Sequence, residues 1–226
     1  MIARETISNV EAVCREIGDA RGQTILDIGC GTGELCRALA GKGAKITGID
    51  PGENAIAQAI ELGGGATYQA TTLDDAELSP NSIDVVIFCT SLHHIPNMAD
   101  ALQGAIKLVK NSGKVIIVEP QPDDPLYPVY RWLDDEKEVQ TQAQNAIDEI
   151  IEAGRLTRSK TLYLSKKYRY ASLDALINDM LEVDASRSLS DDTRKKMSDA
   201  FDAATEQDDE GDYIDHWYRL DVLEME

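Results

Sequence analysis

Basic residues are scarce in this chain, and their scarcity limits the partners it can bind. The 226 residues include 22 Lys and Arg against 41 Asp and Glu, a formal net charge of −19. Proteins that hold nucleic acid displace counterions with clustered Lys and Arg, and the short basic run at residues 165–169 is too small to outweigh the surrounding acid. The sequence therefore argues against nucleic acid and anionic membranes as partners. The acid excess indicates a self-repelling surface or adaptation to a salty cytoplasm.

Metal-binding and disulfide patterns are also missing. None of the four cysteines is spaced C-x-x-C, and two of the three histidines, His93 and His94, are adjacent, so their side chains should diverge. We expect no metal site, and we expect reduced thiols in a cytoplasmic protein. Residues 1–20 carry charge throughout, and no apolar run has the length of a membrane span, so we expect neither a signal peptide nor stable membrane insertion.

Short apolar runs alternate with helical patterns in the first half of the chain. This alternation is typical of parallel strands covered by helices on both faces. It predicts a doubly wound, Rossmann-like α/β fold that binds ligands beyond the carboxyl ends of its strands. The expected strands are 24–28, 44–50, 66–70, 82–88 and 114–119, and the expected helices are 2–20, 33–42, 53–62 and 97–110.

The alternation of strands and helices stops in the second half of the chain. Four prolines within residues 120–128 predict a loop. We expect one domain over 1–226 with a seven-stranded, mostly parallel sheet. Its parts would be a cofactor-binding core (1–120), a helical lid and acceptor region (121–210) and a closing strand (211–226). The elements expected after the loop are helices at 132–153, 172–183 and 190–205, strands at 157–170 and 213–223, and an acidic turn at 206–211.

A glycine-rich turn joins the first expected strand to the next helix, in residues 25–35, ILDIGCGTGEL. The spacing is G-x-G-x-G, with Asp27 two residues before the first glycine, whereas a dinucleotide fingerprint is G-x-G-x-x-G. An acid there would repel a pyrophosphate and attract an ammonium group. Asp50 ends the second strand, where a carboxylate can accept hydrogen bonds from ribose hydroxyls. A ligand with a ribose and a cation but no phosphate chain fits best, which describes S-adenosylmethionine.

Four stretches carry a resemblance to a known family. LDIGCGTGELCRAL (26–39), GIDPGENAIAQA (48–59), SPNSIDVVIFCTSLHHIPNMADAL (79–102) and LVKNSGKVIIVEP (108–120) resemble the motifs of class I S-adenosylmethionine-dependent methyltransferases, in their small-molecule and lipid branch. The resemblance covers about residues 24–120. It implies that S-adenosylmethionine is the cofactor and that a methyl group passes to a small-molecule or lipid-like acceptor.

The resemblance also implies cofactor contacts, which follow the order of the strands. The family's adenine-binding acid after the third strand is displaced or absent here, because Thr72 and Leu73 occupy its position and Asp74 and Asp75 follow. Cys30 and Cys89 have the simpler alternative of being small buried residues. The implied contacts are Asp27, Gly29, Cys30 and Gly31 for the methionine portion, Asp50 for the ribose, Pro51, Thr72 and Leu73 near the adenine, and Cys89 and Thr90 near the sulfonium.

Candidate residues for the acceptor side follow the fourth and fifth strands. Histidine suits a general base near neutral pH, and of the adjacent pair we favour His94 over His93. Glu119 ends the fifth strand and is a further catalytic candidate. Tyr127 and Tyr130, in the Pro-rich loop, are candidates for binding the acceptor. Each of these residues could equally have a structural role.

The leading interpretation is therefore a methyltransferase. An alternative is a protein that binds S-adenosylmethionine or S-adenosylhomocysteine without catalysis. A nicotinamide-dependent oxidoreductase is a weaker alternative, because the glycine spacing and Asp27 oppose it. The sequence leaves the acceptor atom and the oligomeric state open.

Overall fold

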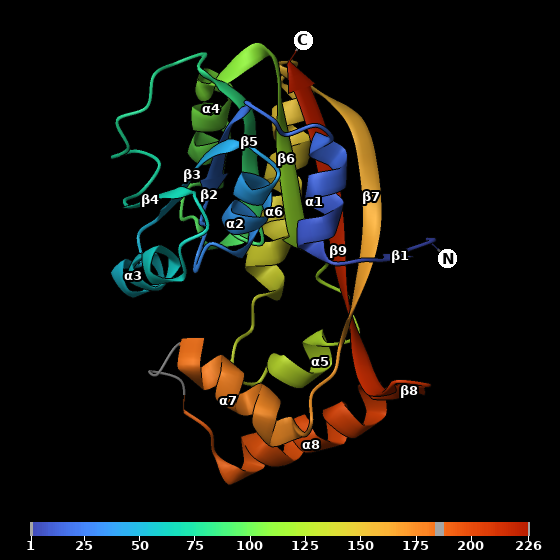
Figure 1. The fold of residues 1–226 in the computed structure, drawn as a ribbon. Coiled ribbons are helices and arrows are strands. Elements are labelled where there is room, and N and C mark those ends of the chain that lie inside the picture. Colours follow the sequence, from blue (N-terminus) through green and yellow to red (C-terminus); the bar gives the residue numbers. More distant parts are fainter. Residues whose placement is uncertain (1, 184–187, 226) are drawn as a thin grey trace.

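A computed structural model describes residues 2–183 and 188–225 (Figure 1). The strands are β1 (Glu5–Thr6), β2 (Thr24–Ile28), β3 (Lys45–Asp50), β4 (Thr67–Ala70), β5 (Ile83–Cys89), β6 (Val109–Pro120), β7 (Leu156–Tyr168), β8 (Glu206–Asp208) and β9 (Gly211–Met225). The α-helices are α1 (Asn9–Ile17), α2 (Glu34–Gly41), α3 (Glu53–Leu62), α4 (Met98–Leu108), α5 (Tyr127–Tyr130), α6 (Lys137–Glu152), α7 (Leu173–Val183) and α8 (Asp191–Ala204), and η1 (Leu92–His94) is a 3₁₀ turn.

The strands form one mixed sheet in the order β1-β7-β9-β6-β5-β2-β3-β4, with β8 paired to β9. All pairs among β2 to β6 are parallel, and β9 runs antiparallel to its neighbours β6, β7 and β8. The predicted α/β fold class is confirmed. The seven expected strands are all present, and the short β1 and β8 raise the described count to nine.

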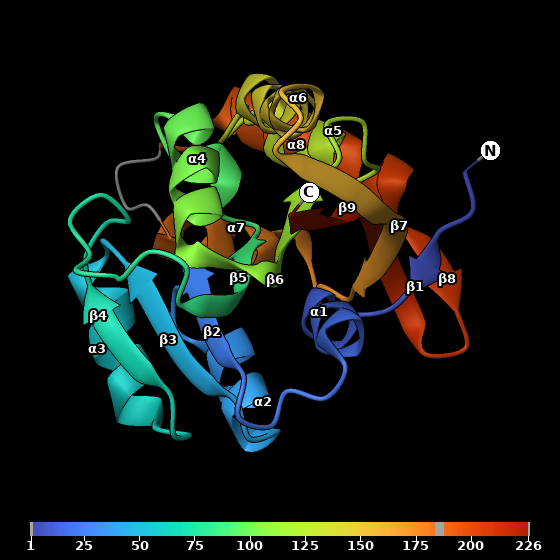
Figure 2. The same ribbon diagram turned by 90° about the horizontal axis from the view of Figure 1, so that it is seen from above.

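Helices cover both faces of the sheet (Figure 2). Along β5 the side chains alternate between the two faces, as they must in a strand. Val86 and Phe88 pack in the core under α4 and α6, whereas Val85 and Ile87 pack in the core under α1 and α2. Because both faces are buried, the strand reads as a continuous apolar run.

A separate small core lies beyond the carboxyl end of the sheet. Side chains of α5, α7, α8 and β9 form it, including Tyr130, Leu176 and Ile214. These three helices stand apart from the main body in Figure 1, and we call them the cap. The expected lid included the long helix of the 121–210 region, but α6 packs its Ala143 and Ile147 in the main core beside α4. The cap is therefore smaller than the expected lid.

Several expected elements have different boundaries. The strand expected at 114–119 begins at Val109, the helix expected at 132–153 begins at Lys137, and the acidic turn expected at 206–211 begins with strand β8. The first helix was expected over 2–20, but Ser8 starts it later through a reciprocal capping box with Glu11, and residues 5–6 pair with β7 instead. The Pro-rich loop contains the short helix α5, with Pro128 in its first turn. In the described part of the chain, no helix combines the length and apolar character needed to cross a membrane.

Candidate active site

A cavity of about 550 Å³ lies at the carboxyl ends of β2, β3 and β5. Gly29 after β2, Asp50 at the end of β3 and Thr90 after β5 all line it. This edge is where doubly wound folds bind their ligands. The structure therefore brings together residues from three of the four sequence motifs.

Gly29 allows the β2–α2 loop to approach the loop that follows β5. Its φ is +73°, and a Cβ atom added to it would lie 2.4 Å from Ser91 Cβ. Thr90, beside Ser91, also has a positive φ, +57°, which costs a β-branched residue conformational energy. The two loops thus meet in strained geometry at the floor of the cavity.

Asp50 holds the glycine loop to the loop after β3. Its Oδ2 accepts a hydrogen bond from Gly31 N at 3.0 Å, and its Oδ1 accepts one from Gly52 N at 2.8 Å. An ionised carboxylate has about four acceptor positions, so it retains capacity for ligand hydroxyls. The residue is placed to organise the loops and to contact a ribose.

Asp27 lies beneath the loop and outside the cavity lining. It is 2% exposed, and Cys36 Sγ donates to its Oδ2 at 3.3 Å. Its Oδ1 is buried without a hydrogen-bond partner among the described residues. Burial raises the pKa of Asp27 to about 7. The hydrogen bond from Cys36 opposes this shift, and the charge of Asp50 adds to it. A nearby ammonium group would satisfy this carboxylate.

The expected adenine side of the cavity is lined by Pro51, Thr72 and Leu73. Asp74 lines it as well, so an acid is present in the loop after β4, displaced from its expected position. Thr72 Oγ1 is bonded to Asp75 instead, at 2.8 Å. The resemblance left open whether this acid was displaced or absent, and the structure places Asp74 in the lining.

Besides Asp27, three further expected cofactor residues do not line the cavity. Cys30 contacts the opposite side of the loop, near Cys36 and Gly48. Gly31 contributes its amide to Asp50. Cys89 is packed in the core under α1 and α2, and burial raises the pKa of its thiol. Both cysteines are partly buried and pack against the core under α1 and α2.

Glu119 is buried at the end of β6 and organises η1. Its Oε1 accepts hydrogen bonds from Ser91 N at 3.2 Å and from Leu92 N at 2.9 Å, and its Oε2 contacts His93 Nδ1. Burial lowers the pKa of His93, but the bond to Glu119 and its charge outweigh this, so the net shift is upward. Neither Glu119 nor His93 lines either of the cavities described here, and together they fix the turn that carries His94.

His94 lines the first cavity and also a second cavity, of about 300 Å³, on the cap side. Its side chain is 63% exposed, and Glu136 Oε1 lies 4.0 Å from its Nε2. Burial of the ring and the charge of His93 lower the pKa of His94. The neutral form, which can accept a proton, therefore predominates at neutral pH.

The second cavity has aromatic walls drawn from distant parts of the chain. Its lining includes Tyr130 of α5, Tyr168 at the end of β7, Tyr170 just after that strand, and His216 of β9. The rings of Tyr168 and Tyr170 are stacked with centroids 5.7 Å apart. Tyr127 lies elsewhere, with its hydroxyl donating to Asp135 Oδ1 at 2.8 Å. The structure thus brings Tyr130, but not Tyr127, to this cavity.

Sequence reasoning missed His216 as a functional candidate. Its Nδ1 lies 2.8 Å from Oδ2 of the buried Asp124. No local motif marks the pair, because the two residues lie at opposite ends of the second half of the chain. The one available signal was that the chain has only three histidines, which makes each of them a candidate for a functional role.

A third residue joins the adjacent histidines. Ligand atoms of His93, His94 and Glu136 lie within 4.8 Å of one another, a grouping that a metal ion could bridge. Glu136 comes from the start of α6, so sequence spacing gave no sign of it. The His93 and His94 rings are tilted by 45° with centroids 4.0 Å apart, so their in-plane lone pairs would have to turn to converge on one ion.

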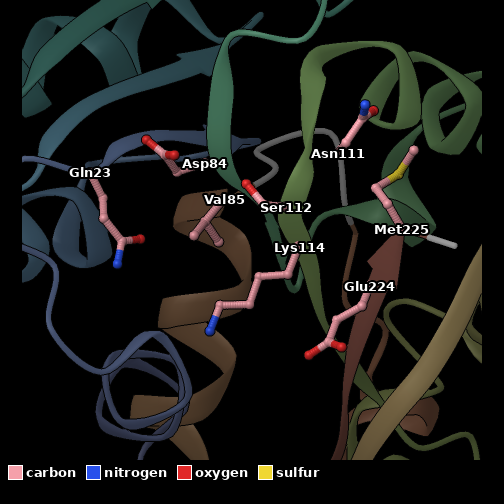
Figure 3. Close-up of a pocket in the computed structure, with 9 residues that line it drawn as sticks. Gln23, Asp84, Val85, Asn111, Ser112, Lys114, Glu224 and Met225 are labelled. Atoms are coloured by element: carbon pink, nitrogen blue, oxygen red, sulfur yellow. The ribbon is translucent and has the colours of Figure 1, made fainter.

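A further hollow, of about 440 Å³, lies at the opposite end of the sheet (Figure 3). Asp84 at the start of β5, Lys114 of β6 and Glu224 near the end of β9 line it. It lies at the amino ends of the parallel strands, away from the glycine loop. It is therefore unrelated to the site described above.

Comparisons with known proteins identify the family of the chain. Residues 3–180 match a family model described as "Methyltransferase domain". A "Ubiquinone biosynthesis O-methyltransferase" of Pseudomonas paraeruginosa is 40% identical over 101 residues, which cover 42% of this chain and 44% of the relative. The matched segments span less than half the length of the curated relatives.

Solved structures share the fold over nearly the whole chain. The YcgJ protein from Bacillus subtilis superposes with a TM-score of 0.61 at 17% identity, covering 96% of this chain and 98% of its own. An S-adenosylmethionine-dependent methyltransferase from Mesorhizobium loti gives a TM-score of 0.56 at 16% identity, covering 96% and 97%. Because the family model matches more than three quarters of the described chain, this protein belongs to the methyltransferase domain family.

Proposed function

We propose that this protein transfers the methyl group of S-adenosylmethionine to a small-molecule acceptor. The observation that carries the proposal is the pair of cavities with His94 in the lining of both. The first has the loop geometry for a ribose-containing cofactor, and the second, with aromatic walls, is the place for an acceptor. A cytoplasmic location remains a prediction from the reduced cysteines.

The residues of the first cavity fit this cofactor. Gly29 leaves room where any side chain would meet Ser91. Asp50 would hold the ribose hydroxyls, Leu73 and Pro51 would pack near the adenine, and the unpartnered Oδ1 of Asp27 would face the ammonium group. When bound, S-adenosylmethionine supplies an electrophilic methyl group on a sulfonium sulfur.

The chain itself contributes position and proton transfer. Glu119 and His93 hold η1 against the end of β6, and so fix the boundary between the two cavities. The tyrosines that line the second cavity would pack against the acceptor. An acceptor with a proton to lose requires a base, and His94, the base favoured by the sequence, is one of two histidines in reach.

Calorimetry with S-adenosylhomocysteine and a labelled methyl-transfer assay test the proposal together. We expect binding by the wild-type chain, and a loss of at least about a hundredfold in Gly29→Val, because the new side chain meets Ser91. Gly154→Val is the matched control, since its positive φ lies in open space far from the site. Absence of binding by the wild-type chain would refute the proposal.

The same assay separates catalysis from binding alone. Labelled S-adenosylmethionine is incubated with the chain and a metabolite extract, and label in any extracted compound supports a transferase. Tight cofactor binding without label in any compound would favour the alternative of a binding protein. The O-methyltransferase name of the curated relatives suggests hydroxylated aromatic compounds as the first pure acceptors to screen.

A further inference from the structure

Two histidines reach the second cavity, and the protein holds them very differently. The His94 ring is largely exposed and lies 4.0 Å from the carboxylate of Glu136. His216 is 12% exposed, and its Nδ1 lies 2.8 Å from Oδ2 of Asp124, whose side chain is fully buried. A catalytic base needs a fixed ring direction. His216 meets this requirement better than His94 does.

Backbone amides fix the orientation of Asp124. Its Oδ1 accepts hydrogen bonds from Leu126 N at 2.6 Å and from Tyr127 N at 3.1 Å, at the start of α5. Only Oδ2 is left to face the imidazole. The two atoms lie at ion-pair distance without forming a hydrogen bond, since neither has a hydrogen-bond partner among the described residues. A carboxylate this close to Nδ1 favours the ring proton on that nitrogen, which leaves the lone pair of Nε2 free. The ring also lies in the lining of the cavity, so Nε2 is the nitrogen available to a ligand.

Aromatic rings enclose His216 on its other sides. Its centroid lies 4.5 Å from that of Tyr218, 5.6 Å from that of Tyr168 and 6.3 Å from that of Tyr130, all edge-on. Burial raises the pKa of Tyr130, and burial with the neighbouring Tyr168 raises that of Tyr218, so both remain neutral phenols. They do not compete with His216 for a proton.

Charged groups in the same cavity come from the cap side and from η1. The carboxylates in its described lining are Asp134, Glu136 and Asp179, and His94 is the other histidine. No Lys or Arg of the described residues belongs to the lining. No fixed cation in this lining would therefore ionise a bound phenol, so a weakly acidic phenol should lose its proton only during transfer.

We propose that His216 is the general base for a hydroxylated aromatic acceptor, with Asp124 as its positioning residue. This inference rests on the proposed methyl transfer. The acceptor oxygen forms a bond to the methyl carbon while the carbon–sulfur bond breaks. The bonding pair stays on the sulfur, which becomes a neutral thioether, and the hydroxyl proton passes to Nε2 of His216. Solvent later removes that proton.

Acceptor acidity provides the first test. His216→Gln should slow turnover of a weakly acidic phenol by about 10²–10⁴-fold, the usual contribution of a general base. The same variant should lose much less with a nitrophenol, which is already ionised near neutral pH. A merely structural residue would reduce both rates equally. His94→Gln is the matched comparison: His94 lines both cavities, so its loss should lower the phenol and nitrophenol rates by the same factor.

Nuclear magnetic resonance of the histidine rings provides a test that needs no turnover. The chain has three histidines, so His216 can be assigned by comparison with the His216→Gln spectrum. In Asp124→Asn, the two backbone amides still require an oxygen at Oδ1, and the new NH₂ group must face Nδ1. We expect the ring to change from the Nδ1–H to the Nε2–H tautomer, and phenol activity to fall with it.

The outcomes distinguish this inference from the proposed function. If the wild-type chain binds S-adenosylhomocysteine and methylates phenols, but His216→Gln keeps the full rate, the inference is wrong and the function stands. Loss of phenol activity but not of nitrophenol activity in His94→Gln alone would assign the base to His94. An unchanged tautomer in a folded Asp124→Asn variant would refute the positioning role. Absence of any transfer by the wild-type chain refutes both.

Discussion

Asp27 illustrates how a residue proposed to bind the cofactor can oppose folding. Its pKa is about 7 in the folded chain against an ordinary value of 3.8, first because it is buried. Between these values the folded chain keeps a proton that the unfolded chain has released. The free energy of unfolding therefore decreases as the pH rises through this window, by at most about 4 kcal/mol.

Replacing this carboxyl should separate stability from binding. We expect Asp27→Asn to be more stable than wild type at pH 8, by about 1–3 kcal/mol, and by less than half of that at pH 5, where most of the pH window is still to be crossed. Its affinity for S-adenosylmethionine should fall, because the charge for the ammonium group is gone. Urea unfolding and calorimetry at both pH values measure these effects. Asp84→Asn is the control, and its change in stability should have the opposite sign. Burial raises the pKa of Asp84, but the bonds from Lys110 and Thr24 outweigh burial and lower it. Equal stability of Asp27→Asn and wild type at pH 8 would contradict the prediction.

The 3₁₀ turn η1 depends on one buried ion pair with Glu119. The folded pKa of His93 is raised above 6.5, so the protonated pair stabilises the fold fully below that value. This contribution is lost as the pH rises through the folded pKa. A hydrogen bond to a charged group contributes about 1.5–3 kcal/mol.

Removing the charge of Glu119 should reveal that dependence. Glu119→Gln keeps an oxygen for Ser91 N and Leu92 N. We expect it to be less stable than wild type by about 1.5–3 kcal/mol at pH 5.5, and nearly equal to it at pH 9. Denaturant unfolding at several pH values measures the difference. A difference independent of pH would show that His93 stays neutral in the folded chain.

The elements that could be predicted from the sequence are those whose signals are local. The glycine turn after β2, the acid ending β3 and the apolar run of β5 are each contained in a few residues, and parallel strand order brings them to one edge. The family, the fold class and the position of the first cavity follow from them. The predicted start of the first helix was wrong because the capping box of Ser8 and Glu11 starts the helix at Asn9, whereas the apolar pattern alone does not mark a start.

The acceptor side could not be predicted in the same way. The second cavity combines a turn after β5, the short helix α5, and the ends of β7 and β9. Asp124 and His216 meet because β9 returns antiparallel beside β6, which places Tyr218 opposite Pro120. Pairings of this kind depend on register between distant strands, and no spacing along the chain encodes them. Tyr130 and Tyr127 look equivalent in sequence, yet the turn of α5 directs only Tyr130 to the cavity.

The charge of the whole molecule gives a final prediction. At a net charge of −19, exposed carboxylates repel one another more in the compact chain than in the unfolded one. Salt shortens the range of that repulsion from about 10 Å at 0.1 M to about 3 Å at 1 M. We expect the melting temperature to rise between these concentrations of KCl by about 2–8 °C, equivalent to about 1–2 kcal/mol for a chain of this size.

A charge-reduced variant shows whether repulsion is the cause. Four exposed acids without an ion pair among the described residues can be changed to the corresponding amides, which reduces the net charge from −19 to −15: Glu61, Glu77, Asp199 and Asp202. This variant should melt at a higher temperature than wild type in 0.1 M KCl and gain less from added salt, because less repulsion is left to screen. Equal gains in the two proteins would show that KCl acts through general exclusion from the surface. A gain that continues well beyond 1 M in wild type alone would favour adaptation to a salty cytoplasm.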